Sequence, residues 1–357
     1  MKTHKIAVFG GDGIGPEVTT EGMKVLDAVA QSADFKLETV EYPFGSEHYL
    51  KTGELMPDSI WDELKGFDAI FLGAIGDPRV EVGLVERAII AGIRFKLDLF
   101  INLRPIKLYN EALCPLKDKT CADVDMVFVR ENTEGAYMAL GGIMKRDTPD
   151  EIAVCDMVWT KRGCQRAIEY AFEVARKRNK GNKVTLVDKA NAIRAMDIWT
   201  RTFEEVGERY PDIAREHAYI DAACMWMVKN PEWFDVGVTA NLFGDIITDL
   251  GAMVQGGMGV AASGNIHPGQ VSMFEPIHGS APKYKGQNVA CPIAAIMAGA
   301  MMLDFLGETT GSQRIENAVT SILKEGKLPS LDARSGIKTS EVGDMVAKAV
   351  TDVTMKA

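Results

Sequence analysis

Short apolar runs that end abruptly in polar residues recur along this chain and alternate with segments of helical periodicity. Residues 16–33 and 162–179 carry apolar side chains at helical spacing, and Pro16 suits the first turn of a helix. The apolar runs are 5–11, 68–76, 124–132, 183–191, 216–224 and 234–245. Strands that alternate with helices predict an α/β fold with a largely parallel sheet.

Length and charge narrow the possible functions. The chain has 357 residues, which suggests two domains, and no low-complexity linker separates them, so we expect interwoven domains. The net charge of −10 argues against a nucleic-acid or anionic-membrane partner. The six cysteines show neither a CxxC pair nor zinc-like spacing. With no signal peptide and no apolar run long enough to span a bilayer, the sequence predicts a cytoplasmic protein.

Polar and charged residues follow several of the predicted strands. In open α/β sheets, ligands bind beyond the carboxyl ends of the strands, so these residues are candidates for one site. Arginines suit carboxylate ligands, and aspartates suit a hard divalent cation. Taken singly, each has a bland explanation, such as a solvated arginine, a helix cap or a surface ion pair. The set comprises Arg130, Lys189, Asp221, Asn241, Asp245 and Asp249, with a further basic pair, Arg94 and Arg104.

The segment TANLFGDIITDLG places Asp245 and Asp249 four residues apart. In a helix this spacing puts both carboxylates on one face, where they repel by about 0.2–0.5 kcal/mol. Capping by Asn241 and the helix dipole offer a purely structural explanation. If a cation relieves the repulsion instead, replacing Asp245 by Asn is expected to stabilise the metal-free protein.

The glycine motifs do not match a dinucleotide fingerprint. GGDGIG at 10–15 follows a strand, but its spacing is GxGxG rather than GxGxxG. The segment 256–265 contains GxGxxA, yet it follows a helix. We therefore do not assign a Rossmann fold, and a tight turn with positive φ explains the first motif.

Several motifs together resemble the β-decarboxylating dehydrogenases, which include 3-isopropylmalate, isocitrate, homoisocitrate and tartrate/D-malate dehydrogenases. The resemblance implies an isopropylmalate/isocitrate dehydrogenase-like α/β fold with a discontinuous large domain, 1–104 plus 256–357, and a central domain, 105–255. It also implies a homodimer, in which the lysine and one aspartate of each site come from the partner. The motifs are GDGIGPEV, LRP, VRENTEGAY, VDKAN, NLFGDIITDLG, FEPIHGSAPKYKG and PIAAIMAGAMMLDFLG.

By motif match, the resemblance assigns roles in the oxidative decarboxylation of a small 2-hydroxy acid with a C3 carboxylate. Lys189 is expected to be the general base or its relay, and Tyr137 to protonate the enolate. The carboxylates of the substrate are expected to bind Arg94, Arg104 and Arg130. The ligands of Mg²⁺ or Mn²⁺ are expected to be Asp221, Asp245 and Asp249. An inactive regulatory homologue is the remote alternative, and the intact residue set counts against it.

The cofactor loop implied by the resemblance is HGSAPKYKG. NAD-using relatives often carry Asp after Ser-Ala-Pro, whereas Lys283 and Tyr284 stand here, as in NADP-using isocitrate dehydrogenases. The C-terminal tyrosine of those enzymes has no match in 325–336. NAD and NADP both stay open, with NAD favoured. The implied contacts are His278, Gly279, Ser280, Ala281, Pro282, Lys283, Tyr284 and Cys291, which replaces the usual Asn.

Substrate choice depends on the predicted helix before Arg94. Isocitrate enzymes place Ser and Asn where this chain has Ala88 and Ile90, and isopropylmalate enzymes use a Leu pair where it has Ile90 and Ala91. The pocket is therefore expected to be apolar and enlarged. 3-Isopropylmalate, a leucine-biosynthesis intermediate, ranks first and D-malate or tartrate second. An inward-turned Arg87 would instead favour homoisocitrate, although a solvated Arg87 is the simpler interpretation.

Overall fold

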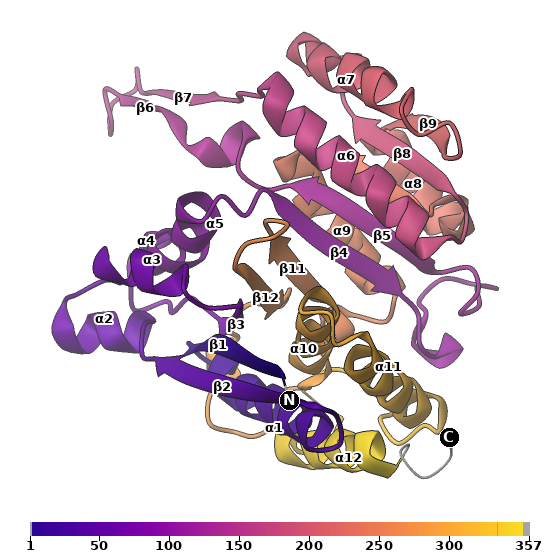
Figure 1. Cartoon of the computed structure of the whole chain (residues 1–357). Helices are drawn as coiled ribbons and strands as arrows, with labels where there is room; N and C mark the ends of the chain where they lie inside the picture. The colour runs from indigo at the N-terminus through magenta and orange to yellow at the C-terminus, as the bar shows by residue number, and fades with distance from the viewer. Residues whose placement is uncertain (1, 334, 353–357) are drawn as a thin grey trace. The chain divides into compact units, whose positions relative to one another are not determined.

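The computed structural model describes residues 2–333 and 335–352. The chain forms two compact units (Figure 1). The first unit contains the described residues of 1–99, 107–122 and 252–357, and the second contains 100–106 and 123–251. Relative to the domain bounds expected from the sequence, 100–104 lie in the second unit, and 107–122 and 252–255 lie in the first.

The first unit is built on a sheet with strand order β2-β1-β3-β12-β11. β1 pairs in parallel with β2 and β3, β12 pairs in parallel with β3, and β11 is antiparallel to β12. Every residue of β3 is buried, because helices cover both faces of the sheet and an apolar run is stable there. The strand bounds are β1 Lys2–Gly11, β2 Phe35–Tyr42, β3 Ala69–Ala74, β11 Ala262–Ile266 and β12 Ser272–Pro276.

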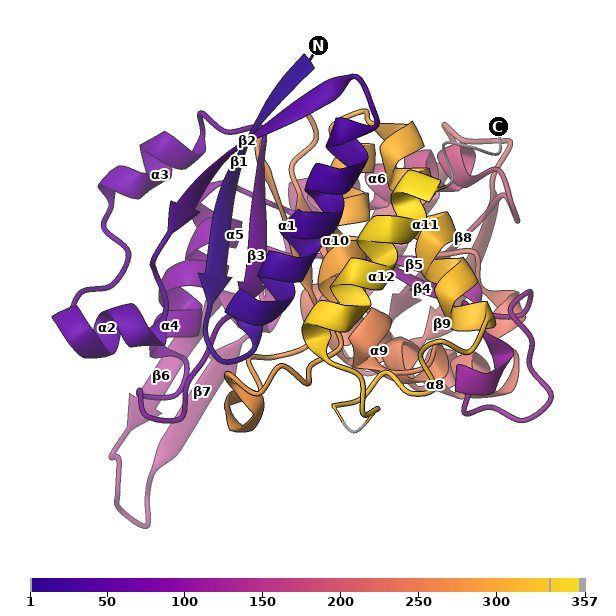
Figure 2. The same cartoon turned by 90° about the horizontal axis from the view of Figure 1, so that it is seen from below.

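Two groups of helices cover the sheet of the first unit (Figure 2). One group is α1, α10, α11 and α12, which pack on one another. The other group is α2, α3, α4 and α5, which surround an apolar cluster that includes Phe9, Trp61, Leu72 and Ile93. The bounds are α1 Gly15–Gln31, α2 Ser46–Thr52, α3 Ser59–Leu64, α4 Leu84–Glu86, α5 Gly92–Lys96, α10 Ile293–Phe305, α11 Thr309–Lys324 and α12 Thr339–Asp352.

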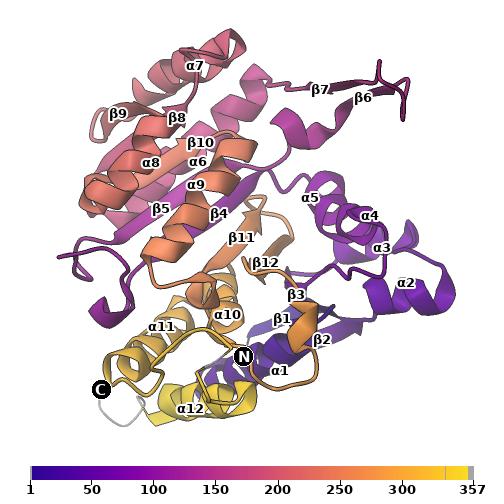
Figure 3. The same ribbon diagram turned by 180° about the vertical axis from the view of Figure 1, so that it is seen from behind.

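The second unit has strand order β4-β5-β10-β8-β9, and β5, β10, β8 and β9 pair in parallel. α6 and α7 cover one face, while α8 and α9 cover the other (Figures 1 and 3). The carboxyl ends of the parallel strands therefore meet at one edge, as the sequence predicts. The bounds are β4 Ile101–Lys107, β5 Asp125–Glu131, β8 Lys183–Asp188, β9 Ala214–Tyr219, β10 Val236–Thr239, α6 Lys161–Arg178, α7 Asp197–Gly207, α8 Ile220–Lys229 and α9 Asn241–Val254.

A two-stranded antiparallel arm projects from the second unit (Figure 1). It consists of β6 Leu140–Met144 and β7 Ile152–Asp156. All of its strand residues are exposed, including apolar ones such as Leu140, Ile143 and Val154. An isolated hairpin is marginally stable in water, so this arm is a surface that another body would stabilise.

The predicted α/β fold with a largely parallel sheet is confirmed by these elements. Pro16 lies in the first turn of α1, as expected from the sequence. Among the described residues, no helix combines the length and apolar character that crossing a membrane would require.

Candidate active site

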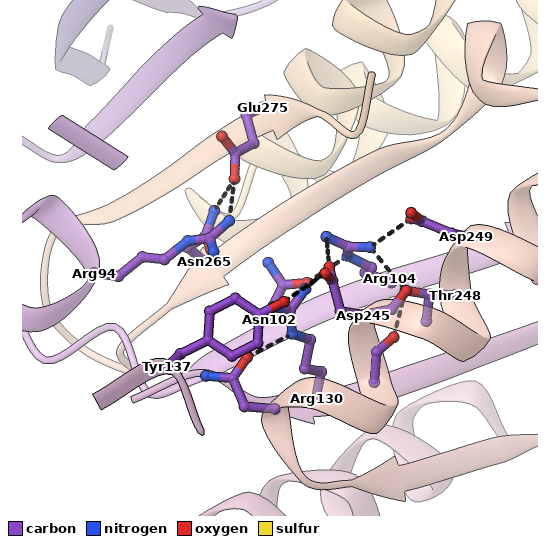
Figure 4. Close-up of polar contacts among 12 residues, drawn as sticks. Arg94, Asn102, Arg104, Arg130, Tyr137, Asp245, Thr248, Asp249, Asn265 and Glu275 are labelled. Carbon is purple, nitrogen blue, oxygen red and sulfur yellow. Dashed lines mark hydrogen bonds and ion pairs between the residues drawn. The ribbon is translucent and has the colours of Figure 1, made fainter. Parts of the chain in front are cut away.

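Asp245 and Asp249 lie one turn apart on α9, and Arg104 of β4 is within ion-pair distance of both. The Arg104 guanidinium lies 3.4 Å from Asp245 Oδ1 and 3.3 Å from Asp249 Oδ1 (Figure 4). It also donates to Thr248 Oγ1 at 2.8 Å and to Asn102 Oδ1 at 2.6 Å. A buried arginine thus lies between the two carboxylates and offsets the repulsion expected from their i, i+4 spacing.

Arg130, near the end of β5, holds the same carboxylate from another side. Its Nη1 donates to Asp245 Oδ1, while Nε and Nη2 donate to Asn241 Oδ1 at 2.9 and 2.8 Å. Helix capping does not account for Asn241, because its oxygen accepts from Arg130. The dipole explanation for Asp245 also fails, since no acidic residue lies in the first turn of α9.

Tyr137 completes this group. It lies on the 3-10 turn Gly135–Met138, and its hydroxyl donates to Asp245 Oδ2 at 2.7 Å. Its ring faces the Arg130 guanidinium, 5.4 Å from the ring centroid. The side chain is exposed, so Tyr137 is not part of the hydrophobic core.

The two carboxylates of α9 have opposite pKa shifts. For Asp245, burial alone raises the pKa, but the charges of Arg130 and Arg104 and the Tyr137 hydrogen bond outweigh it and lower the pKa. For Asp249, burial and the nearby Asp245 charge raise the pKa against the opposing effect of Arg104. Asp249 is therefore the carboxylate that further positive charge would most help to ionise.

Lys189 and Asp221 form a separate pair within the second unit. Lys189 follows β8 and Asp221 lies in the first turn of α8, with Nζ 2.6 Å from Oδ1. The Lys189 hydrogen bond lowers the pKa of Asp221. The neighbouring Asp188 is buried and accepts from His217 and Thr200, so Lys189 does not form a surface pair with it.

The carboxylates that could bind a divalent cation are limited by the contacts they already make. Among residues 2–333 and 335–352, no group of three or more His, Cys, Asp or Glu side chains could hold a metal ion. Asp245 and Asp249 still provide two hard oxygen donors on one helix face, which is the donor type that Mg²⁺ and Mn²⁺ bind. The third predicted ligand, Asp221, is engaged with Lys189.

In the first unit, Arg94 of α5 pairs with the buried Glu275, Nη2 to Oε1 at 2.9 Å, and Asn265 donates to the same oxygen at 2.8 Å (Figure 4). The predicted helix before Arg94 contains a π-helical turn, Arg87–Ala91, between α4 and α5. Ile90 and Ala91 lie on this turn, half-buried, while Arg87 is exposed, as its simpler interpretation predicts.

The predicted cofactor loop is anchored to the glycine turn after β1. Ile14 N donates to Ser280 O at 2.8 Å, and Ser280 Oγ donates to Gly76 O at 2.6 Å. Gly13 has a φ of 59°, and a Cβ there would lie 1.9 Å from Ser280 O, so the turn requires glycine, as expected.

Within that loop, burial lowers the pKa of His278, and its Nε2 is buried without a hydrogen-bond partner. Gly279 is exposed, Ala281 has a φ of 39°, and a 3-10 turn spans Pro282–Tyr284. Lys283 Nζ lies 4.7 Å from the Tyr284 ring centroid. Burial raises the pKa of Cys291 to about 11.

Sequence reasoning missed the residues that hold the arginines, namely Asn102, Thr248, Glu275 and the contact role of Asn241. Asn102 lies two residues before Arg104, whereas the other three contact a guanidinium from a distant part of the chain. Glu275 and Arg94 are 181 positions apart. Only the motif FEPIHG could have indicated Glu275, and no sequence pattern indicated the contacts of Thr248 and Asn241.

Comparisons with known proteins agree on one family. Residues 5–346 match the family model described as isocitrate/isopropylmalate dehydrogenase. A 3-isopropylmalate dehydrogenase of Mycobacterium avium is 48% identical over 351 residues, covering 97% of this chain and 100% of the relative. One from Thermobifida fusca is 46% identical over 354 residues, covering 98% and 99%.

Solved structures give the same picture. The crystal structure of an isocitrate dehydrogenase from Methylococcus capsulatus has a TM-score of 0.86 at 36% identity, covering 98% of this chain and 99% of that one. A β-decarboxylating dehydrogenase from Thermococcus kodakarensis has a TM-score of 0.79 at 31% identity, covering 99% and 98%.

Proposed function

Because this chain belongs to the isocitrate/isopropylmalate dehydrogenase family, we propose that it catalyses the oxidative decarboxylation of 3-isopropylmalate with hydride transfer to NAD, as a step in leucine biosynthesis. The observation that carries the proposal is the group around Asp245, in which the buried Arg104 and Arg130 and the exposed Tyr137 all contact its carboxylate. It combines carboxylate-binding guanidiniums with a phenol able to donate a proton. The relatives at 46–48% identity support this substrate over isocitrate.

The arginines are proposed to bind the substrate carboxylates. Arg104 and Arg130 lie among neutral acceptors as well as Asp245, so each guanidinium is fixed in orientation before substrate arrives. A fixed planar guanidinium can form two parallel hydrogen bonds to a carboxylate at little entropic cost. Arg94, held by Glu275 in the first unit, is proposed to bind a carboxylate in the same way.

Asp245 and Asp249 are proposed to hold Mg²⁺ or Mn²⁺, with Asp221 of a second subunit as the further ligand. A bound cation of this kind would polarise the substrate oxygens and stabilise negative charge on the enolate. The chain's own contribution is to keep Asp245 ionised, since Arg130 and Arg104 lower its pKa against the effect of burial.

Proton transfers are assigned to Lys189 and Tyr137. Lys189 is proposed to remove the proton of the substrate hydroxyl as a general base or relay. Tyr137 is proposed to donate its hydroxyl proton to C3 after carbon dioxide has left, and to recover a proton from solvent, to which it is exposed.

A homodimer is proposed as the active form, and exposed apolar surface supports it. On α8, Met225 is 73% exposed, and Trp226 and Val228 are exposed beside it. Ile246 and Met253 of α9 are exposed too, as is the β6–β7 arm. Exposed apolar surface on this scale marks an interaction site. A cytoplasmic location is also proposed, supported by six free cysteines.

The half-buried Ile90 and Ala91 are proposed to contact the C3 substituent. Where relatives carry leucine, Ala91 leaves room for a branched alkyl group, and each methylene contributes about 1–3 kcal/mol of selectivity. NADP is the alternative cofactor, because Lys283 and Tyr284 resemble the pair found in NADP-using isocitrate dehydrogenases.

One panel of assays tests this function: 3-isopropylmalate, D-malate, tartrate, isocitrate and homoisocitrate, each with NAD and NADP. The highest kcat/KM is expected for 3-isopropylmalate with NAD, and chelator is expected to abolish turnover until Mn²⁺ is restored. A higher kcat/KM for D-malate would replace the substrate, and full turnover in chelator would disprove the metal assignment.

A further inference from the structure

Asn241, the first residue of α9, is buried and has no assigned function beyond its contacts. Its Oδ1 accepts from Arg130 Nε and Nη2 at 2.9 and 2.8 Å, and its Nδ2 donates to the main-chain oxygen of Glu134 at 3.2 Å. An arginine only donates and a carbonyl only accepts, so the amide has one possible orientation here. Both ends of this side chain are therefore used, each on a different segment.

The Glu134 end leads directly to Tyr137. Glu134 immediately precedes the 3-10 turn Gly135–Met138. Its carboxylate accepts from Thr160 N and Oγ1 at 2.9 and 2.6 Å, and its N–H donates to Glu131 Oε2 at 2.8 Å. These contacts join the turn to α6 and β5, whereas the Asn241 amide joins it to α9.

The other end of the Asn241 side chain, its Oδ1, orients the guanidinium of Arg130. Arg130 runs past Gly244, where a Cβ would lie 2.5 Å from its Cγ, so the side chain packs tightly on α9. With Nε and Nη2 on Asn241, its Nη1 meets Asp245, which also accepts from Tyr137. One amide thus determines where the guanidinium and the phenol-bearing turn lie relative to each other.

We propose that Asn241 is a positioning residue that aligns the carboxylate-binding Arg130 with the proton-donating Tyr137. The inference rests on the proposed function. Its consequence is that the proton reaches C3 of the enolate from one face, because substrate and phenol are held in a fixed relation. When the C–CO₂ bond breaks, its electrons form the enolate, and the new C–H bond takes the Tyr137 proton.

Two substitutions separate the two ends of the amide. Asn241→Asp keeps an acceptor for Arg130 but replaces the donor that holds Glu134 O with an oxygen that repels it. Asn241→Ala removes both contacts. Thr248→Val is the matched control, since Thr248 lies on the same helix and accepts from Arg104 rather than from Arg130.

The first measurement needs no substrate. Amide hydrogen exchange of peptides spanning 132–140 reports how firmly the turn is held. With one hydrogen bond lost, exchange is expected to be roughly five- to tenfold faster in Asn241→Asp and Asn241→Ala, and unchanged in Thr248→Val. Exchange in Asn241→Asp equal to that of the unmodified protein would overturn the inference even if the enzyme's substrate were another acid.

The second measurement follows turnover of 3-isopropylmalate in D₂O, with the keto acid trapped by reduction. The unmodified enzyme and Thr248→Val are expected to give a single configuration at the monodeuterated carbon, and Asn241→Asp a mixture with KM within about threefold. Asn241→Ala is expected to give the mixture and a KM raised roughly ten- to hundredfold, because a buried hydrogen bond to a charged group is lost.

The two measurements distinguish failure of the proposed function from failure of the role proposed for Asn241. No turnover of 3-isopropylmalate by the unmodified protein would contradict the proposed function and leave the exchange result as the test of Asn241. A single configuration from Asn241→Asp in an active, folded enzyme would overturn the alignment of Arg130 and Tyr137. A thermal midpoint is recorded for each variant, and loss of folding in Asn241→Ala leaves Asn241→Asp as the deciding variant.

Discussion

Two groups of oppositely charged residues lie in the second unit, and they are built differently. In the α9 group, the side chains of Arg130 and Arg104 are 1% and 6% exposed, and each contacts a neutral acceptor as well as Asp245. In the other group, Lys189 and Asp221 are 24% and 67% exposed and contact each other. Contacts within one chain therefore hold the side chains of the first group in place. An exposed ion pair such as Lys189–Asp221 contributes little to stability and holds its side chains only weakly.

In the proposed homodimer, this difference assigns the exposed pair to the subunit interface. Asp221 of the pair lies in the first turn of α8, a helix that also carries the exposed Met225 and Trp226. If a second subunit covers that face, the ion pair is desolvated and Lys189 and Asp221 can serve the partner's α9 group. The α9 group would then bind and orient substrate, and the pair would supply chemistry across the interface.

The largest effect is expected from Lys189→Met. Turnover should fall at least about 100-fold, because a general base contributes roughly 10²–10⁴ to the rate, while cofactor binding and the thermal midpoint stay unchanged. Steady-state kinetics and a melting curve measure this. Lys161→Met is the control, since Lys161 forms a comparable exposed pair with Glu205. Near-normal turnover of Lys189→Met would refute its role.

Mixing two inactive variants tests whether Lys189 acts across a subunit interface. If Lys189 acts across an interface, Lys189→Met and Tyr137→Phe homodimers are both nearly inactive. Heterodimers formed by mixing them recover activity, because one of the two sites contains neither substitution. The recovered rate is measured against mixing ratio. No recovery in verified heterodimers would place Lys189 and Tyr137 of one chain in the same site.

The next effect concerns Asp245→Asn, and here the structure corrects an expectation from the sequence. Asp245 accepts from the buried Arg130 and from Arg104, so removing its charge does not simply relieve repulsion. The metal-free protein is expected to lose about 1–2 kcal/mol, because a buried guanidinium keeps only a neutral partner. Weaker Mn²⁺ binding should accompany this. A stabilised metal-free variant would restore the earlier expectation.

Asp249→Asn, one turn away, is expected to have the opposite sign. Burial and the charge of Asp245 raise the pKa of Asp249, so its ionised form is disfavoured in the folded state. The substitution should leave metal-free stability unchanged or raise it by less than about 0.5 kcal/mol. Mn²⁺ binding should weaken as for Asp245→Asn. Thermal midpoints with and without Mn²⁺ check both signs, and destabilisation without metal would contradict the argument.

The contrast between these aspartates shows what the sequence could predict. The alternation of apolar runs and helices was enough for the fold, and the strand-end pattern indicated which residues could meet. The i, i+4 spacing gave the repulsion between Asp245 and Asp249 but not the arginines that offset it, because those come from β4 and β5. The spacing of residues within a helix predicts only the interactions made within that helix.

Contacts that depend on strand register were beyond the sequence. Thr239 of β10 pairs with Arg130 of β5, and this register brings Arg130 next to Asn241 two residues later. The π-helical turn Arg87–Ala91 was also missed, since apolar spacing does not distinguish it from an α-helix. The roles assigned by motif match stay predictions.

The smallest effect concerns the anchor behind Lys189. Asp188 is buried and accepts from His217 at 3.0 Å, and this hydrogen bond raises the pKa of His217 against the lowering effect of burial. A raised folded-state pKa means that this pair stabilises the fold fully below the unfolded pKa of about 6.5 and that the contribution is lost as pH rises through the folded value. Because His217 is partly exposed, solvent screens the effect. His217→Gln should therefore lower the thermal midpoint at pH 6 and change it less at pH 9. An equal change at both pH values would mean that His217 acts through packing alone, and that Asp188 holds the chain beside Lys189 without help from its charge.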